Sequence, residues 1–241
     1  MVGLDTGYFQ NNLYFKNDAE PTENIRVDLR DITAEHLKGF QAVVHLAGLS
    51  NDPLGALNQK LTDDINTKAS EKLADLAKKT GVQRFVFASS CSIYGAASQH
   101  ETPLDETAPC NPVSAYAVSK LAVENYLKTL ADDTFAPVSL RFATAYGLSP
   151  RVRLDLVLNN LVACAVLTKT IKVMSDGTPW RPLIHVQDMA LAILAALKAP
   201  RENIFGQSLN IGRNDANYQV RDIAQIVAKT VPEATLDITG E

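Results

Sequence analysis

Several features that mark membrane-bound, secreted or nucleic-acid-binding proteins are absent from this sequence of 241 residues. No apolar stretch reaches the roughly 20 residues that a transmembrane helix needs. The net charge is -4 and there is no long basic run, which disfavours nucleic-acid binding. Residues 1–5 carry neither the basic region nor the long apolar core of a signal peptide. We therefore expect no membrane partner and no nucleic-acid partner.

Cysteine is also scarce in this sequence. Cys91, Cys110 and Cys164 are the only three, and their spacing is unlike that of metal-binding motifs. An odd number of cysteines in a chain without a signal sequence is typical of a reducing compartment. We therefore expect a cytoplasmic protein without a metal site. Internal repeats and low-complexity segments are absent as well.

The composition itself is that of an ordinary globular protein, with 46% hydrophobic and 21% charged residues. The length suits one large domain, or one domain with a small lobe. Short apolar runs alternate with stretches that repeat apolar residues every three or four positions. This alternation predicts an α/β fold with a doubly wound, Rossmann-like parallel sheet covered by helices on both faces. The expected strands are Val2–Leu4, Ile25–Val27, Ala42–Leu46, Arg84–Ala88 and Val138–Phe142, and the expected helices are Ile65–Lys79 and Ala115–Leu130.

The pattern changes after about residue 148. We expect residues 1–148 to form the sheet domain and residues 149–241 to form mainly a smaller α/β lobe, interleaved with that domain. The expected helices of the second part are Leu154–Thr168, Val186–Lys198 and Val220–Val231, and its expected strands are Ile171–Met174 and Ser208–Ile211.

A tyrosine and a lysine four residues apart, Tyr116 and Lys120, share one face of an expected helix. About 25 residues earlier, small polar residues close the apolar strand Arg84–Ala88, and Ser90 is among them. In a parallel sheet the carboxyl end of a strand can reach such a helix face. A lysine cation favours the phenolate of a neighbouring tyrosine, and a serine hydroxyl can hold a substrate oxygen. Taken alone, the tyrosine–lysine pair is more typical of a plain surface pair on a helix, and the Ser90 segment upstream is what favours a site.

These residues belong to an ordered set of motifs that runs through nearly the whole chain. By this set the chain resembles an extended short-chain dehydrogenase/reductase of the nucleotide-sugar epimerase/dehydratase branch. The resemblance implies NAD as cofactor, a nucleotide-diphosphate sugar as substrate, and a homodimer. The matching residues are Asp5, Val27–Asp31, His45–Gly48, Asn66, Ser89–Gly95, Tyr116–Lys120, Arg141 with Tyr146-Gly147, Asn159–Leu161 and Trp180–Val186.

The resemblance also implies a role for individual residues. Tyr116 would be the general acid and base, Lys120 would hold the nicotinamide ribose and lower the tyrosine pKa, and Ser90 would bind the sugar oxygen that is oxidised. Residues 1–148 would then be the NAD-binding domain. Its cofactor contacts would be Asp5, Asp28, Leu29, Ala47, Gly48, Asn66, Ser89, Tyr116 and Lys120. Residues 149–241 would be mainly the substrate-binding lobe, and the contacts to the nucleotide sugar would be Ser92, Thr144, Asn160 and Arg181.

Two parts of this assignment have alternatives in the sequence. Asp28 and Asp31 also suit turn or helix-cap positions before the helix-like Ala34–Lys38. Thr144 stands where many members of the family have asparagine, so the sugar is expected to sit differently.

The family's glycine-rich turn, Gly-x-x-Gly-x-x-Gly, is not found in the 241 residues. By the resemblance, Val2–Asp5 is already the family's second strand, so we expect two strands that flank the missing one to lose backbone partners. The C-terminus also stops before the family's usual final segment. The sequence is compatible with a truncated form, with a true short paralogue, and with replacement of the strand by another segment or subunit.

The reaction follows from the residues after Ser90. The family's 4,6-dehydratases carry Asp-Glu immediately after this serine or threonine, whereas this chain has Cys91 and Ser92. Neither side chain can do the work of a carboxylate, which disfavours dehydration. The expected reaction is epimerisation, by transient oxidation of a sugar hydroxyl and return of the hydride to the opposite face. The alternatives are a dehydratase or reductase of the same family, or a catalytically silent paralogue that cannot hold NAD alone.

Overall fold

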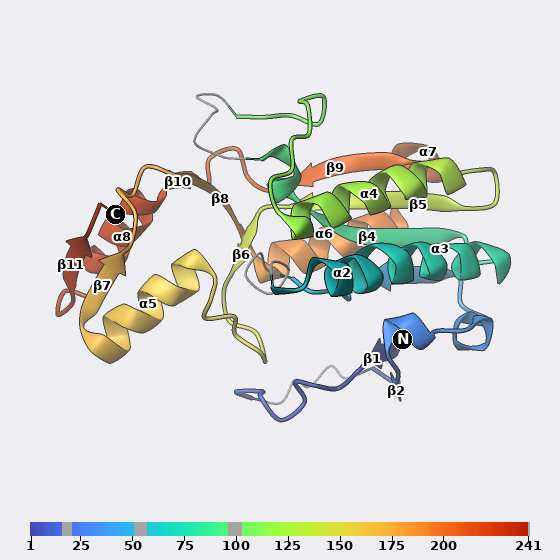
Figure 1. The fold of residues 1–241 in the computed structure, drawn as a ribbon, viewed down its shortest axis with the longest axis horizontal. Helices are drawn as coiled ribbons and strands as arrows, with labels where there is room; N and C mark the ends of the chain where they lie inside the picture. The colour runs from blue at the N-terminus through green and yellow to red at the C-terminus, as the bar shows by residue number, and fades with distance from the viewer. Residues whose placement is uncertain (16–20, 51–56, 96–102, 241) are drawn as a thin grey trace.

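The computed structural model describes residues 1–15, 21–50, 57–95 and 103–240. Figure 1 shows two unequal parts, a larger one built on a sheet with helices packed along it and a smaller one that holds the C-terminus. The larger part positions the expected catalytic residues.

The main sheet has four parallel strands in the order β3-β4-β5-β9. These strands are Ala42–His45, Arg84–Ser90, Ala136–Phe142 and Gln207–Ile211. All four run in the same direction, so their carboxyl ends meet at one edge of the sheet. The predicted doubly wound α/β fold is confirmed in this sheet.

Helices cover both faces of the main sheet. The helices α3 (Ala69–Lys79) and α4 (Ala115–Leu130) lie on one face, and α6 (Val186–Lys198) lies on the other. The alternation of β4 explains the arrangement, because Phe85 and Phe87 are buried among residues of α3 and α4, while Val86 is buried among residues of α6. Each face of the central strand is thus apolar, as a parallel sheet requires.

The helix that the sequence places at Ile65–Lys79 is longer in the structure. It begins with α2 (Gln59–Thr62), continues as the π-helical segment η3 (Asp63–Lys68) and runs into α3. A π-helical segment inside a helix shifts the side chains that follow it and is frequent at functional sites. Asn66, one of the predicted cofactor residues, lies in η3.

The strands β1 (Val2–Asp5) and β2 (Glu23–Arg26) form a parallel pair that is separate from the main sheet. Within the described residues β1 pairs only with β2, and β3 pairs only with β4. Among the described residues, each of the two strands expected to flank the missing one thus has one strand neighbour. The 3-10 helices η1 (Leu29–Asp31) and η2 (Ala34–Leu37) follow β2.

The smaller part has its own buried core, formed by residues of α5 (Val157–Thr168), β7 (Thr170–Val173), β8 (Trp180–His185) and α8 (Val220–Thr230). Strand β11 (Thr235–Ile238) pairs with β7 in parallel. The chain crosses between the two parts more than once, since α6 and β9 return to the main sheet after β8. The remaining elements are η4 (Cys91–Tyr94), β6 (Thr144–Tyr146), α7 (Arg201–Ile204) and β10 (Asn217–Gln219).

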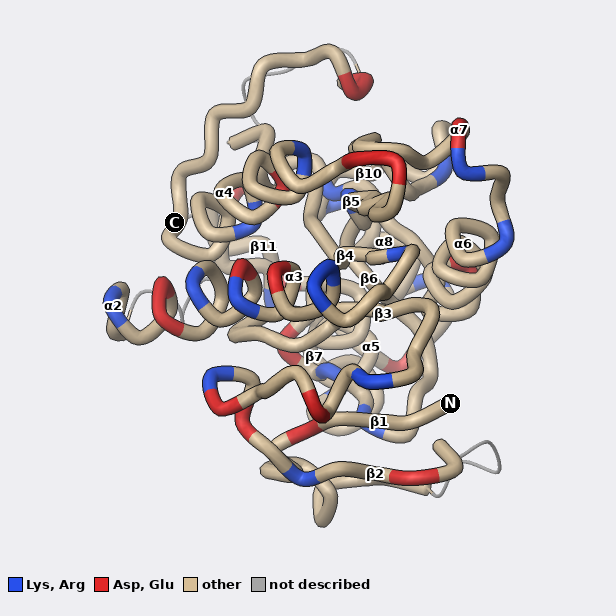
Figure 2. Tube along the Cα trace, turned by 90° about the vertical axis from the view of Figure 1, so that its right-hand side faces the viewer, with Lys and Arg blue, Asp and Glu red and all other residues tan. Residues whose placement is uncertain are grey.

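Charged residues are interspersed along the chain. Figure 2 shows basic and acidic positions alternating along α2 and α3. The ion pairs of η3 follow this pattern, because the Lys68 ammonium contacts both Asp63 and Asp64. None of the helices in the described ranges combines the length and apolarity that crossing a membrane requires.

Candidate active site

Helix α4 brings Tyr116 and Lys120 to the carboxyl end of β4. The Lys120 side chain is buried, and its Nζ donates a hydrogen bond of 2.8 Å to the carbonyl of Ala88. The same Nζ lies 4.7 Å from the ring centroid of Phe87 and 5.6 Å from that of Tyr116. Burial lowers the pKa of Lys120 to about 8. The ammonium is therefore mostly charged at neutral pH and lies beside the phenol ring.

Ser90 ends β4, two residues after Ala88. Its Oγ accepts hydrogen bonds from the backbone N–H of Ser92, at 3.2 Å, and from the hydroxyl of Ser92, at 2.9 Å. Ser90 also caps η4 through the first of these bonds. With both bonds accepted, the hydroxyl proton of Ser90 remains for donation to a ligand oxygen.

A buried ion pair fixes α4 against the sheet one turn beyond Lys120. Glu124 is fully buried, and Arg141 of β5 contacts both of its carboxylate oxygens, with the shortest distance 2.8 Å. Ser89 and Ser208 donate to the same carboxylate from β4 and β9. The hydroxyl of Ser89, predicted to contact the cofactor, is therefore engaged by Glu124.

Asn66 joins the loop after β3 to helix α4. Its Oδ1 accepts from the N–H of Leu49 at 2.8 Å, and its Nδ2 donates to the Leu49 carbonyl and to the hydroxyl of Ser119. Gly48 precedes Leu49 with a φ of +142°, and a Cβ there would lie 3.0 Å from Asn66 Oδ1. Only glycine suits this backbone and this close approach. The predicted residues Ala47 and Gly48 are both exposed just beyond the end of β3.

The predicted adenosine contacts follow β1 and β2. Asp5 is exposed, and its Oδ1 accepts from the backbone N–H of Gly7 at 2.6 Å. Asp28 caps η1, and the guanidinium of Arg30 contacts both of its carboxylate oxygens. The hydrogen bond from Arg30 lowers the pKa of Asp28. These contacts support the cap interpretation of Asp28, and Leu29 is buried in the core beneath α3.

The predicted sugar contacts lie on four different elements, the first of which is η4 with Ser92. Thr144 begins β6 and is half-buried, and Arg181 of β8 donates to the carbonyl of Trp180. Arg181 also lies within electrostatic range of Cys91. Asn160 lies on α5, where its Nδ2 donates to the carbonyl of Leu154 at 3.0 Å. The structure thus gives Asn160 a role in holding the loop before its own helix.

Cys91 follows Ser90 but has the properties of an inert thiol. Burial raises the pKa of Cys91 to about 11, so the group is protonated at neutral pH. In the part of the chain that the structure describes, no group of three or more His, Cys, Asp or Glu side chains is arranged to hold a metal ion.

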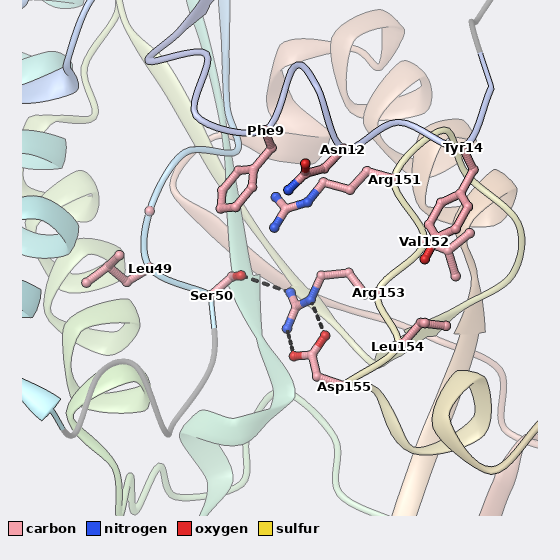
Figure 3. A pocket seen from close by; sticks show the side chains of 11 residues that line it. Phe9, Asn12, Tyr14, Leu49, Ser50, Arg151, Val152, Arg153, Leu154 and Asp155 are labelled. Carbon is pink, nitrogen blue, oxygen red and sulfur yellow. Dashed lines mark hydrogen bonds and ion pairs between the residues drawn. The ribbon is translucent and has the colours of Figure 1, made fainter. Parts of the chain in front are cut away.

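A second group of candidate residues was not predicted from the sequence. Arg151 and Arg153 line a cavity of about 420 Å³ together with Phe9, Asn12, Tyr14 and residues 48–50 (Figure 3). The hydrogen bond to Asp155 raises the pKa of Arg153, with a smaller electrostatic contribution from Tyr116. The signal available in the sequence was an Arg-x-Arg pair directly after the expected domain boundary.

The main sheet with a tyrosine–lysine helix at its carboxyl edge is the architecture of an NAD-binding α/β enzyme. The model of the NAD dependent epimerase/dehydratase family matches residues 1–212, and the chain belongs to this family. NAD is the cofactor of the family.

Two relatives and one solved structure illustrate the similarity. The chain is 31% identical over 177 residues to the uncharacterized UDP-glucose epimerase YtcB of Bacillus subtilis, and 30% identical over 227 residues to the UDP-glucose 4-epimerase of Mus musculus. These matches cover 73% and 84% of this chain, and 54% and 64% of the relatives. The structure of TunA, an NAD-dependent NDP-hexosamine 5,6-dehydratase, aligns with a TM-score of 0.83 at 23% identity, covering 99% of this chain and 75% of TunA. At this identity, the similarity to TunA concerns the fold alone.

The residues present fit the nicotinamide half of NAD. Gly48 lies just beyond the end of β3, and its lack of a side chain accommodates the close approach of Asn66 Oδ1. Lys120 and Tyr116 lie at the carboxyl end of the neighbouring strand β4. At the other end, Asp5 offers one carboxylate oxygen beyond its bond to Gly7. The NAD diphosphate lies between the nicotinamide end and the adenosine end. No glycine-rich turn within these 241 residues would hold it.

Proposed function

We propose that this chain is an NAD-dependent nucleotide-sugar epimerase in which Tyr116, Lys120 and Ser90 act on the sugar. The observation that carries the proposal is the position of the Lys120 ammonium. It lies 5.6 Å from the Tyr116 ring centroid and donates to the Ala88 carbonyl, two residues before Ser90. One cation therefore links the proton-transferring phenol to the strand end that carries the serine.

In the proposed reaction Tyr116 takes a proton from a sugar hydroxyl as a phenolate and later returns it. A phenol has a pKa near 10 in water, so it needs a nearby cation to ionise at neutral pH. The buried Lys120 ammonium supplies that cation. Ser90 donates its hydroxyl proton to the sugar oxygen, because its Oγ already accepts a hydrogen bond from the Ser92 hydroxyl. NAD, when bound, supplies hydride transfer from and back to the sugar carbon.

The surroundings of Ser90 favour epimerisation over dehydration. Dehydration needs further proton transfers, and a carboxylate beside Ser90 would serve them. The two following side chains are the protonated thiol of Cys91 and the hydroxyl of Ser92. Glu124 is held by Arg141 and the two serines that donate to it, so it is not available for proton transfer. The similarity to UDP-glucose 4-epimerases supports UDP-hexoses as the first substrates to test.

The test is a turnover assay of the purified chain with NAD and a panel of UDP-sugars, with products identified by NMR. Tyr116→Phe keeps the ring but removes the hydroxyl, so turnover is expected to fall by at least about a hundredfold. Tyr126→Phe is the matched control, because Tyr126 lies on the same helix and its hydroxyl contacts Asp75 instead. Wild-type turnover in Tyr116→Phe would remove Tyr116 from its assigned role.

The alternative is a silent chain that does not hold NAD alone. It is favoured by the lack of a glycine-rich turn in these 241 residues. The discriminating measurement is the absorbance and mass of any ligand released when the purified protein is denatured. Release of NAD would exclude this alternative. The expected homodimer is tested in the same preparation by its mass in solution.

A further inference from the structure

One buried tyrosine near the candidate active site is not used by the proposed epimerisation. Tyr94 is the last residue of η4, the turn that begins directly after Ser90, and it is 8% exposed. Its hydroxyl accepts a hydrogen bond from Arg141 Nη1 at 2.8 Å and donates one to Asn210 Oδ1 at 2.7 Å. The hydroxyl is therefore engaged by one residue of β5 and one residue of β9.

The partners of Tyr94 fix the direction of both hydrogen bonds. A guanidinium can only donate, so the Tyr94 oxygen accepts from Arg141 and gives its own proton to another group. Asn210 presents its oxygen to that proton, while its Nδ2 donates to the carbonyl of Leu104 at 3.3 Å. Burial raises the pKa of Tyr94, so the proton stays on this phenol at neutral pH. Tyr94 thus has the properties of a structural hydroxyl and not those of a second acid–base group.

Asn210 is itself held by the segment that precedes α4. Its backbone N–H donates to Glu106 Oε1 at 2.7 Å, and its side chain donates to Leu104 of the same segment. The oxygen that receives the Tyr94 proton is therefore fixed in orientation. A group whose partners are locked in this way holds its own segment precisely.

The guanidinium that binds Tyr94 also holds helix α4. Nε and Nη2 of Arg141 contact the carboxylate of Glu124, with the shortest distance 2.8 Å, and Nη1 contacts Tyr94. Glu124 lies about two turns after Tyr116 on the same helix. Arg141 therefore joins the helix that carries the proposed acid–base group to the turn that follows Ser90.

Both ends of η4 are anchored to the main sheet. At the start of the turn, Ser90 accepts from the N–H of Ser92 at 3.2 Å, and at its end Tyr94 is bound to β5 and β9. Ile93 is fully buried between them, and its carbonyl accepts from the N–H of Asn111 at 2.9 Å. Without the Tyr94 hydroxyl, the turn would keep its start but lose the two side-chain hydrogen bonds at its end.

We propose that Tyr94 is a positioning residue, whose hydroxyl fixes η4 and thereby directs the Ser90 hydroxyl toward the sugar oxygen on which Tyr116 acts. The inference rests on the proposed function, because it concerns two groups that would meet at the sugar. The Ser92 hydroxyl transmits the position, since it lies within the turn and donates to Ser90 Oγ at 2.9 Å. A displacement of about 1 Å at a reacting group costs up to about a hundredfold in rate, so the anchoring of this turn affects kcat.

The first test is kinetic and uses Tyr94→Phe, which keeps the ring and removes both hydrogen bonds. We expect kcat to fall about tenfold and KM to change less than about twofold. The decisive comparison is a double-mutant cycle with Ser90→Ala. Since Tyr94 acts through Ser90, Tyr94→Phe should lower kcat by less than about twofold when the serine hydroxyl is already absent. A merely structural role would lower kcat by the same factor in both backgrounds.

The second test does not need turnover and uses Cys91 as a reporter of η4. Cys91 is the first residue of the turn, whereas Cys164 lies on α5 in the smaller part of the molecule. Labelling with iodoacetamide, followed by mass spectrometry of peptides, measures both thiols in one sample. In Tyr94→Phe the labelling rate of Cys91 relative to Cys164 should rise about tenfold, because local opening exposes a half-buried thiol.

Tyr126→Phe is the matched control, because the Tyr126 hydroxyl donates to Asp75 of α3 instead, and neither kcat nor the labelling of Cys91 should change. Asn210→Ala is a second variant, which removes the acceptor of the Tyr94 proton and leaves every side chain of η4 in place. It should also speed the labelling of Cys91, and it carries the test where Tyr94→Phe does not fold. Circular dichroism checks the folding of each variant.

Equal losses of kcat in the two backgrounds, or unchanged labelling of Cys91 in Tyr94→Phe, would overturn the inference. Its failure is separable from failure of the proposed function. Turnover at the wild-type rate in Tyr94→Phe removes only the inference. Faster labelling of Cys91 in a chain that turns over no sugar removes only the epimerase and leaves the anchoring of η4 by Tyr94 in place.

Discussion

Lys120 is a residue at which stability and the proposed chemistry oppose each other. In the unfolded chain the Lys120 ammonium keeps its proton up to a pH near 10.4. In the folded chain burial lowers the pKa of Lys120 to about 8. Below pH 8 the fold therefore keeps a buried charge at a cost of about 3 kcal/mol. The gain is an ammonium beside Tyr116, where it favours the phenolate.

Lys120→Met is expected to be more stable than the wild type and inactive. Methionine fills a similar volume without a charge, so the cost of burying the ammonium disappears. The lost hydrogen bond to the Ala88 carbonyl offsets about 1 kcal/mol of this gain. The expected net gain in the free energy of unfolding at pH 7 is about 2 kcal/mol. Between pH 8 and 10.4 the unfolded wild type binds more protons than the folded one, so its stability rises and the gain of the variant shrinks.

Urea unfolding at pH 7 and pH 9.5 measures this difference. Lys128→Met is the control on the same helix, because Lys128 is exposed and its replacement should change stability little at either pH. A Lys120→Met variant that is less stable than the wild type at pH 7 would contradict the cost assigned to the buried ammonium.

Residues whose roles depend on spacing were easier to predict than residues whose roles depend on contacts. The four-residue spacing of Tyr116 and Lys120 placed both on one helix face, and the structure puts the ammonium near the phenol ring. The partners of Ser89 and Asn160 were not predictable, because Glu124 and Leu154 reach them only after folding. These contacts depend on packing, which periodicity does not describe.

Helix α4 is held in place by the Glu124 carboxylate, four residues after Lys120. Arg141, Ser89 and Ser208 come from three adjacent strands and converge on this group. The network sets the distance between the helix that carries Tyr116 and the strand end that carries Ser90. A buried ion pair that loses one partner leaves an uncompensated charge, at a cost of about 3–5 kcal/mol.

Glu124→Gln is expected to destabilise the protein by about 3 kcal/mol, because the Arg141 guanidinium stays buried without its counter-charge. Turnover should fall through kcat more than through KM, since the displaced groups are those proposed to act on the reacting carbon. Glu233→Gln is the control, because the Lys169–Glu233 pair is exposed and such pairs contribute about 0–1 kcal/mol. Equal stability of the two variants in thermal unfolding would contradict a structural role for Glu124.

At the level of elements, the sequence predicted α4 and α6 with their observed bounds, because apolar periodicity and caps coincide there. It placed the start of α5 three residues early, since the apolar run at Leu154 continues the pattern although residues 154 and 155 form a turn. The short strands β6, β8, β10 and β11 were not predicted. Strands of three to six residues with polar positions give a weak alternation, and their pairing depends on distant segments.

At the scale of the whole molecule, the sheet is divided between β1 and β3. The pair β1–β2 and the four-stranded sheet are separate, although Leu4 of β1 and Val43 of β3 both pack against the core beneath α3. Beyond the end of β3, Leu46 is 60% exposed, and within the strand Val44 is 36% exposed. The order of strands around this division agreed with the family resemblance, whereas composition and periodicity carry no information on strand order.

Hydrogen exchange should therefore separate the two sheets by their local stability. A parallel pair of four-residue strands is marginal by itself, so β1 and β2 should open with a free energy well below that of global unfolding. Strands β4 and β5 are each paired on both sides and buried on both faces, so their amides should exchange only through global unfolding. Mass spectrometry of peptides from residues 1–15 and 84–90 compares them directly, and a peptide from β5 serves as the slow reference. If residues 2–5 exchanged as slowly as β5, the β1–β2 pair would have to be part of one continuous sheet.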